Sequence, residues 1–224
     1  MPDVIVVGAG LAGLSAAREL AGLGLAVRVV EREQTPGGRC ATRLLDGQPM
    51  DPGCAFLHGR TPDFIAVLEA VPGRALWGWP RRGDGPGAPC QPDALEPPQK
   101  RVAFEQGLDR LPRHLAAGLD VRFGCEVSAL AEVSGGIACR LTDGGEDLAK
   151  CVVLTAPLPE ARRLLGTLTP RPAALARVTP LLDLVTTEPC AVALARYPAD
   201  APVPEWDVSL PEWGALATLV HDSS

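Results

Sequence analysis

The sequence is poor in groups that bind metal ions. Its 224 residues include three histidines and seven cysteines, and no two cysteines form a Cys-x-x-Cys pair. Metal sites built from protein side chains need closely spaced Cys and His ligands, so we expect no metal site. The odd number of cysteines favours reduced thiols, as in a cytoplasm.

Clusters of basic charge and long apolar runs are also lacking. The net charge is −6, and 21 basic residues, of which only Lys100 and Lys150 are lysines, are scattered along the chain. A nucleic-acid surface needs clustered basic charge, so we expect no nucleic-acid partner. Apolar runs fall far short of the roughly 20 residues that cross a membrane, and the first residues lack the basic segment of a signal peptide. We therefore expect a cytoplasmic protein with no membrane partner; its oligomeric state stays open.

The first 31 residues carry the strongest positive signal. An apolar strand, residues 3–7, runs into Gly8-Ala-Gly10-Leu-Ala-Gly13, and a helical pattern follows. Gly8 permits a tight turn, Gly10 lets a pyrophosphate approach the backbone, and Gly13 lets the helix pack closely on the strand. The free N–H groups and the dipole of the helix favour phosphate charge. This pattern predicts a dinucleotide site, and the alternative is a glycine-rich turn without a ligand.

A second strand ends at Glu31, whose carboxylate suits the hydroxyls of an adenosine ribose. An acid at this position disfavours the 2′-phosphate of NADP. The glycine fingerprint alone does not separate NAD from FAD. The next segment does, because Gly37-Gly38 allows a tight turn over a ligand and Arg39 suits contacts to phosphate. The alternative interpretation of Arg39 is a solvated surface charge.

The Gly-Gly-Arg turn after a ribose-binding acid resembles the flavoprotein amine oxidase and glutathione-reductase-like superfamily. Several segments resemble its renalase-like FAD-dependent members in particular, and they cover most of residues 3–165. These segments are the N-terminal fingerprint and residues 37–42, 50–56, 101–111 and 153–160.

The resemblance implies a discontinuous Rossmann-like FAD/NAD(P)-binding domain of α/β class, glutathione-reductase-like, with an inserted substrate domain. We expect the FAD-binding domain at 1–60 and 99–165, and an incomplete substrate-covering domain at 61–98 and 166–224. In this family a C-terminal segment with a Gly-Asp block returns to the flavin, and the chain ends at Ser224 without such a block. A fragment with half of a flavin site is therefore expected.

The resemblance also implies roles for individual residues. Around the adenosine and pyrophosphate it places Gly8, Gly10, Gly13, Glu31, Gly38 and Val127, the last through its backbone at the adenine. It places Arg39 and Thr42 at the pyrophosphate and flavin side, and Gly53 to Phe56 near the isoalloxazine ring. Ala156 lies where a strand end of the family passes near the cofactor. His58 follows this segment and is a candidate catalytic residue; the alternative is a loop histidine without a chemical role.

Three functions stay open at this point. The first is an FAD-dependent oxidoreductase that takes a hydride from an amine or a dihydronicotinamide-type small molecule, with O₂ as electron acceptor and H₂O₂ as product. The second is a truncated FAD- or nucleotide-binding module without turnover. The third is an NAD-dependent dehydrogenase, which the Gly37-Gly38-Arg39 turn and the interrupted alternation of strands and helices disfavour.

Overall fold

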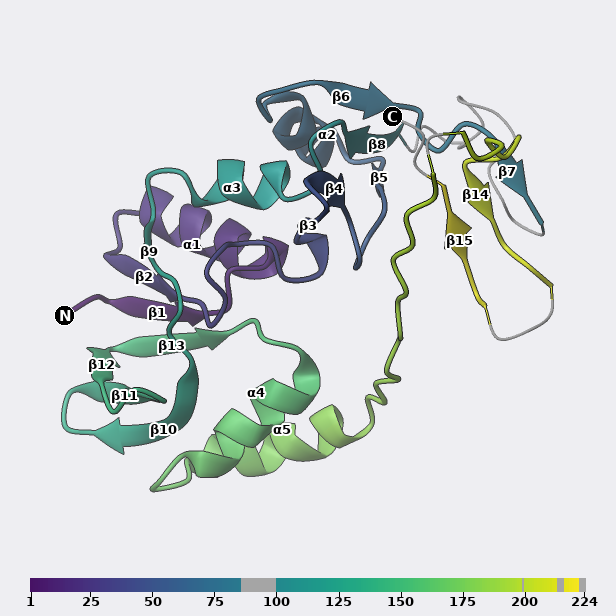
Figure 1. Ribbon diagram of the computed structural model, residues 1–224. Coiled ribbons are helices and arrows are strands. Elements are labelled where there is room, and N and C mark those ends of the chain that lie inside the picture. Colours follow the sequence, from purple (N-terminus) through teal and green to yellow (C-terminus); the bar gives the residue numbers. More distant parts are fainter. Residues whose placement is uncertain (86–99, 199, 213–215, 222–224) are drawn as a thin grey trace. The chain divides into compact units, whose positions relative to one another are not determined.

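The computed structural model describes residues 1–85, 100–198, 200–212 and 216–221. The chain forms two compact units (Figure 1). Unit 1 consists of Met1–Gly38 and Pro112–Ala191, and unit 2 consists of Arg39–Leu111 and Val192–Ser224. These units divide the chain at other places than the expected domains, because residues 39–60 and 100–111 pack with unit 2.

Unit 1 is built on a parallel four-stranded sheet in the order β13-β1-β2-β9. Its strands are β1 Val4–Val7, β2 Val27–Val30, β9 Asp120–Arg122 and β13 Cys151–Leu154, and α1, Leu11–Gly22, connects β1 to β2. Every residue of β1 is buried, as the apolar, β-branched sequence requires for a central parallel strand. The predicted strand–helix–strand start and the Rossmann-like α/β class are confirmed.

An antiparallel meander packs against this sheet. It consists of β10 Val127–Val133, β11 Gly136–Leu141 and β12 Glu146–Ala149. The sequence predicts one strand over residues 121–127, but the structure divides it at Gly124, whose φ of 68° takes the backbone out of the extended region. The sheet and the meander share one core with the helix α4, Leu158–Thr167. This core is formed by Ile5, Val7, Val30, Leu130, Cys139, Leu141, Ala149 and Leu164.

A buried carboxylate connects the meander to the parallel sheet. Asp147 of β12 accepts hydrogen bonds from Arg122 of β9 at 2.6 Å and from Arg28 of β2 at 3.2 Å. The Asp147 side chain is 11% exposed. Two guanidinium groups, from β2 and β9, thus share one carboxylate of β12.

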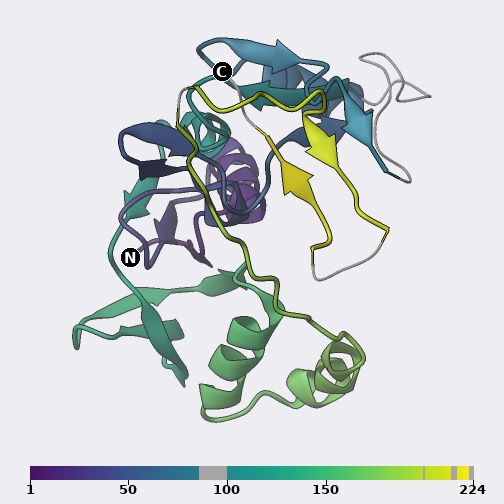
Figure 2. The ribbon, with the colours of Figure 1, turned by 45° about the vertical axis from the view of Figure 1, so that its right-hand side comes forward.

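Two helices complete unit 1, and they lie side by side in both ribbon views (Figure 1, Figure 2). They are α4, Leu158–Thr167, and α5, Ala173–Asp183, and an ion pair between Arg162 and Asp183 joins them. The sequence predicts α4 but treats the next residues as irregular because of their prolines. That prediction is wrong for α5, which contains Pro180 in its interior.

The described residues of unit 2 form three small sheets and the helix α2, Pro62–Glu69. The helix α3, Arg110–Ala116, spans the division between the units. The predicted start of α2 at Thr61 is confirmed. The sheets pair β3 Arg43–Leu45 with β4 Gln48–Met50; β5 Leu57–Gly59 and β6 Ala75–Trp77 with β8 Lys100–Phe104; and β7 Gly83–Asp84 and β15 Leu219–Val220 with β14 Val208–Ser209.

Two further predictions fail in unit 2 and at its border. Residues 72–98 are predicted to hold no regular element, yet β6 pairs with β8 and β7 pairs with β14. Residues 86–98 of this stretch lie outside the described residues. A strand is predicted over 190–196, but these residues are exposed and belong to none of the ladders that the described residues form.

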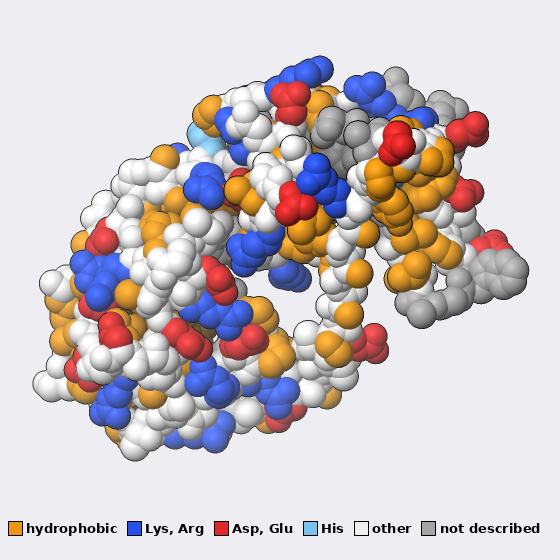
Figure 3. Space-filling model, in the orientation of Figure 1, with side chains coloured by type: hydrophobic (Ala, Val, Ile, Leu, Met, Phe, Trp, Pro, Cys, Tyr) orange, Lys and Arg blue, Asp and Glu red, His pale blue; other side chains and the backbone are white. Residues whose placement is uncertain are grey.

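Charged side chains of both signs are interspersed on the face seen in Figure 3. Hydrophobic side chains gather there over β14 and β15, where Leu219 and Val220 are 36% and 41% exposed. Within the described part of the chain, no helix has the length and apolar character needed to cross a membrane.

Candidate cofactor site

The fingerprint turn of unit 1 follows β1 directly. Gly8 has a φ of 108°, and its N–H donates to the carbonyl of Val30 at 2.9 Å. A Cβ at Gly13 would lie 2.0 Å from the Gly8 carbonyl oxygen, so a side chain there would force α1 away from β1. A Cβ at Gly10 would meet no atom within 4 Å. Gly8 and Gly13 thus serve the turn and the packing, whereas Gly10 borders open space at the start of α1.

The second glycine motif lies against the first. The Gly37 N–H donates to the Ala9 carbonyl at 2.9 Å, and Gly10 and Gly37 form an isolated parallel bridge. Gly38 has a φ of 57°, and a Cβ on it would lie 3.4 Å from the Gly10 Cα. The structure therefore brings the two motifs together at the amino end of α1, 27 residues apart in sequence.

Glu31 is fixed beside this turn. Its carboxylate accepts hydrogen bonds from the backbone N–H of Ala9 at 2.6 Å and from that of Glu33 at 2.9 Å, one on each oxygen. The residue is 8% exposed. Each carboxylate oxygen has a second lone pair, so both oxygens can still accept from ribose hydroxyls. Ala9 is a site residue that the sequence does not reveal, since its contribution is a backbone N–H.

Val127 and Ala156 lie near the same turn through their backbones. The N–H of Cys125 donates to the Glu31 carbonyl at 2.9 Å, so the backbone two residues before Val127 lies beside Glu31. The Val127 side chain is buried in the core, so what it can offer a ligand is its backbone. A Cβ at Gly8 would lie 3.5 Å from the Ala156 nitrogen.

Thr155 is a further residue at this turn that the sequence interpretation missed. Its hydroxyl lies 2.9 Å from the Val7 carbonyl and 3.2 Å from the Gly8 carbonyl, and can donate to either. The hydroxyl thereby connects the end of β13 to the end of β1. The available signal was its position at the carboxyl end of a parallel strand, which is where ligands bind in sheets of this kind.

In unit 2, the segment after Arg39 is held by Asp51. The Thr42 hydroxyl donates to Asp51 Oδ1 at 2.6 Å and accepts from the Asp109 N–H at 3.1 Å. Asp51 also accepts from the Leu108 N–H at 3.1 Å. The Thr42 hydroxyl is thus engaged inside the protein, while the Arg39 side chain is exposed.

Gly53 lies in direct contact with the same segment. A Cβ on Gly53 would lie 2.1 Å from the Arg39 carbonyl oxygen, so this position needs glycine for a close backbone approach. Further along, His58 is exposed on β5, and its ring centroid lies 6.3 Å from that of Phe56. Phe56 in turn contacts Trp79 edge to face, with ring centroids 6.2 Å apart.

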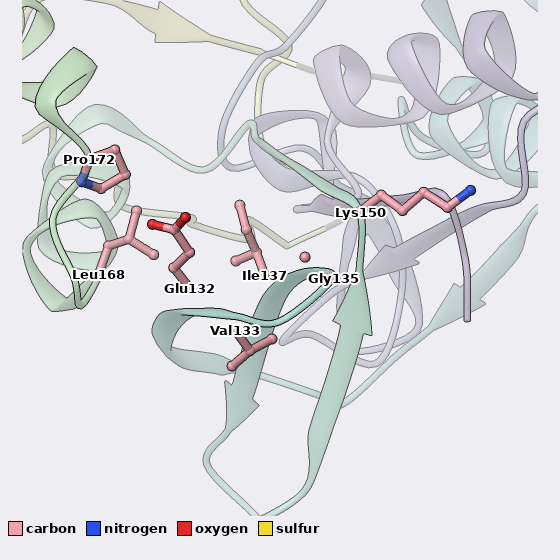
Figure 4. A pocket seen from close by; sticks show the side chains of 8 residues that line it. Glu132, Val133, Gly135, Ile137, Lys150, Leu168 and Pro172 are labelled. Atoms are coloured by element: carbon pink, nitrogen blue, oxygen red, sulfur yellow. The ribbon is translucent and has the colours of Figure 1, made fainter.

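A groove of about 390 Å³ lies elsewhere in unit 1 (Figure 4). Lys150, on its border, points away from the other lining residues and binds Asp3 at 2.7 Å. Asp3 and Lys150 precede β1 and β13, so the groove borders the amino end of the parallel strands, and the fingerprint turn is at their carboxyl end. The groove is lined by Glu132, Val133, Gly135, Gly136, Ile137, Lys150, Leu168 and Pro172.

The geometry of unit 1 fits the adenosine and pyrophosphate part of a dinucleotide. The amino end of α1 has Gly10 as its N-cap, with no side-chain cap and no acidic residue in its first turn. Open space at Gly10 leaves room for phosphate close to the backbone, where the helix dipole favours negative charge.

Comparison with known proteins agrees with this geometry. Residues 6–71 match the NAD(P)-binding Rossmann-like domain family, and residues 79–215, more than half of the chain, match the flavin containing amine oxidoreductase family. The chain is 34% identical over 146 residues to Protein FLOWERING LOCUS D of Arabidopsis thaliana, which covers 59% of this chain and 18% of that protein. It is 48% identical over 66 residues to a putative flavin-containing monoamine oxidase, AofH, of Mycobacterium tuberculosis, covering 30% and 14% respectively.

Among solved structures, the chain is similar to a putrescine oxidase double mutant. The TM-score is 0.61 at 16% identity, over 79% of this chain and 62% of that chain. This likeness concerns the fold. The chain thus spans less than a fifth of the length of the two curated relatives and about three fifths of the putrescine oxidase chain. The family match decides between the cofactors that the fingerprint alone left open: the chain belongs to the family of flavin-containing amine oxidoreductases, and its cofactor is FAD.

Proposed function

We propose that this chain belongs to an FAD-dependent oxidoreductase that removes a hydride from an amine or a dihydronicotinamide-type small molecule. FAD, when bound, supplies a hydride acceptor at flavin N5 and reoxidation by O₂ with release of H₂O₂. The protein binds the cofactor, orients the substrate and controls the access of water. A flavin-containing amine oxidoreductase family match over residues 79–215 supports this reaction class.

In unit 1, we propose that Gly8, Gly10 and Gly13 form the pyrophosphate site. Glu31 accepts hydrogen bonds from the adenosine ribose hydroxyls, and the Val127 backbone contacts the adenine. The observation that carries this proposal is that Glu31 and Gly37 are both hydrogen-bonded to Ala9 in the fingerprint turn. The Ala9 N–H donates to Glu31 at 2.6 Å, and the Ala9 carbonyl accepts from Gly37 at 2.9 Å. Both bonds fix Ala9, the residue directly before Gly10, without the help of a ligand.

Gly38, Arg39, Thr42, Gly53 and Ala156 are proposed to serve the pyrophosphate and the flavin side. The exposed guanidinium of Arg39 suits a phosphate or ribityl oxygen. Thr42 retains one lone pair for a ligand, since its hydroxyl makes two internal hydrogen bonds.

His58 remains the proposed catalytic candidate. A catalytic role predicts that His58→Ala changes the pH dependence of flavin reduction by substrate, whereas a loop histidine without a chemical role predicts an unchanged profile.

Three finer assignments are also proposals. The renalase-like subtype rests on the resemblance of residues 37–42, 50–56, 101–111 and 153–160. The FAD-binding and substrate-covering roles of the predicted domains rest on the same resemblance. A cytoplasmic location is supported by the six described cysteines, all of which are free thiols.

The experiment is anaerobic reduction of the FAD-loaded protein. Putrescine and isomers of dihydronicotinamide dinucleotide are mixed with it in turn, and the visible flavin band is followed. We expect one class to bleach the band and air to restore it with formation of H₂O₂. A band that persists with every substrate, while dithionite bleaches it, contradicts turnover and supports an FAD-binding module without activity.

A further inference from the structure

Cys40 and Cys54 belong to two segments of unit 2 that lie in direct contact. Cys40 follows Arg39, and Cys54 follows Gly53. A Cβ on Gly53 would lie 2.1 Å from the Arg39 carbonyl oxygen and 3.1 Å from the Arg39 Cα, so the two backbones touch there. The next residue on each segment is the cysteine, so the two side chains start from adjacent points of touching backbones, and the ionisation of each thiol depends on the other.

The two thiols have different environments. Cys40 is buried, with 6% of its surface exposed, whereas Cys54 is half-buried and reachable from solvent. As a thiol, Cys54 donates to the Phe56 carbonyl at 2.8 Å. As a thiolate it accepts from the Cys40 thiol. Cys54 is therefore accessible to small reagents, whereas Cys40 is shielded from them.

The charges around the pair favour ionisation of Cys54 rather than Cys40. The neighbouring Cys40 thiol lowers the pKa of Cys54 to about 6 against the opposing effect of burial. The Phe56 backbone and Arg39 lower this pKa further, and Asp51 raises it. The hydrogen bond to Cys54 and burial raise the pKa of Cys40. A thiolate at neutral pH is the form that reacts with peroxides.

The pair does not resemble a metal site. Among the residues that the structure describes, no group of three or more His, Cys, Asp or Glu side chains is arranged to hold a metal ion. An accessible thiolate beside a second, resolving thiol is instead the arrangement of a redox-sensitive dithiol.

We propose that Cys40 and Cys54 are a site of oxidative modification, at which hydrogen peroxide converts the two thiols into an intramolecular disulfide. The Cys54 thiolate attacks one peroxide oxygen, the O–O bond breaks, and Cys54 sulfenic acid and hydroxide form. The Cys40 sulfur then attacks the Cys54 sulfur, the S–O bond breaks, and the Cys40 proton leaves with the hydroxyl group as water. Two electrons pass from the two sulfurs to the peroxide.

The first step makes the second one possible. Sulfenic acid is neutral, so the negative charge that raised the pKa of Cys40 is lost once Cys54 has reacted. The product bonds the segment after Arg39 to the segment after Gly53. The reaction requires only peroxide and is independent of the proposed catalytic turnover, although that turnover would supply this oxidant.

The first test measures the reactivity of each cysteine in the unmodified protein. Iodoacetamide labelling is followed residue by residue by mass spectrometry over a range of pH, with Cys151, an exposed thiol on β13, as reference. We expect the labelling rate of Cys54 to reach half its plateau at a pH of about 6, and Cys40 to resist labelling. A midpoint for Cys54 at its ordinary value of 9.0 overturns the proposal.

The second test adds hydrogen peroxide to the flavin-free protein and maps disulfides after blocking free thiols. A Cys90→Ser background removes the one cysteine outside the described residues. We expect a Cys40–Cys54 disulfide, and in Cys40→Ser a Cys54 sulfenic acid that dimedone traps. Cys151→Ser is the matched control and should leave the disulfide unchanged. Oxidation of Cys151 or Cys190 while Cys40 and Cys54 stay reduced contradicts the proposal. This outcome is measured in the Cys90→Ser protein, so it does not depend on whether Cys40→Ser folds.

Discussion

The Glu31 carboxylate accepts a hydrogen bond of 2.6 Å from the backbone N–H of Ala9, between the first two glycines of the fingerprint. This bond connects the end of β2 to the turn after β1. It gives Glu31 two tasks, because the same carboxylate that is proposed to hold ribose also fixes the backbone that is proposed to hold pyrophosphate.

Glu31→Ala is expected to lower both stability and FAD affinity. The change leaves the N–H groups of Ala9 and Glu33 without their acceptor, at a cost of about 1–3 kcal/mol in the free energy of unfolding. Urea unfolding and FAD titration measure the two effects. Glu19→Ala, an exposed change on α1, is the control and should leave both values near those of the original protein. Unchanged FAD affinity in Glu31→Ala would contradict the ribose assignment.

Gly13→Ala is expected to destabilise unit 1. Its methyl group would lie 2.0 Å from the Gly8 carbonyl oxygen and 2.6 Å from Thr155 Oγ1, so α1 or the turn must shift. Such overpacking typically costs about 1–3 kcal/mol. Gly22→Ala is a matched control, since a Cβ there meets nothing within 4 Å. Equal urea midpoints for the two variants would argue against the close packing of α1 on β1.

Asp51→Asn is expected to loosen the segment after Arg39. An amide replaces one of the two carboxylate oxygens with an NH₂ donor, so the Leu108 N–H, which now donates to both oxygens of Asp51, loses one of its acceptors and faces a second donor. We expect a loss of about 1–3 kcal/mol in unfolding free energy. Asp46→Asn, at an exposed carboxylate, should change stability by less than about 0.5 kcal/mol. If the two variants melt alike, Asp51 does not organise this segment.

Asp207 gives unit 2 a defined pH dependence. Burial raises its pKa, but hydrogen bonds from the Arg82 side chain and from the N–H groups of Arg81 and Arg82 outweigh burial and hold the pKa below 3.8. A carboxyl group with a lowered native pKa contributes its full stability above 3.8, the unfolded value, and loses it as the pH falls through the native pKa.

Urea unfolding across this pH range, compared between the original protein and Asp207→Asn, measures the contribution. The difference should be constant above pH 3.8 and shrink below it. A difference that grows on acidification would mean that Asp207 is not stabilised as a carboxylate.

Local patterns were sufficient to predict the start of the fold. Residues 3–31 contain the apolar pattern of a buried parallel strand, a glycine turn and a helical pattern within one short stretch. The structure has β1, α1 and β2 there. By contrast, the prolines between α4 and residue 189 predict an irregular segment, yet α5 forms there with Pro180 inside it.

The site was harder to predict where it depends on distant partners. The hydrogen bonds from Gly37 to Ala9 and from Leu108 to Asp51 join residues far apart in sequence, and no local periodicity encodes them. Gly53 illustrates the same point, since its need for glycine arises from the Arg39 backbone.

The most direct test of the account is an FAD titration of the flavin-free protein and of Gly10→Ala, followed by flavin fluorescence with ADP as competitor. A methyl group at Gly10 meets no protein atom within 4 Å, so the variant should unfold like the original protein. The account predicts saturable FAD binding that ADP displaces, and a Kd raised at least about tenfold in Gly10→Ala, or ~1.4 kcal/mol. Equal FAD affinity in the two proteins, or no FAD binding by the original protein, would contradict it.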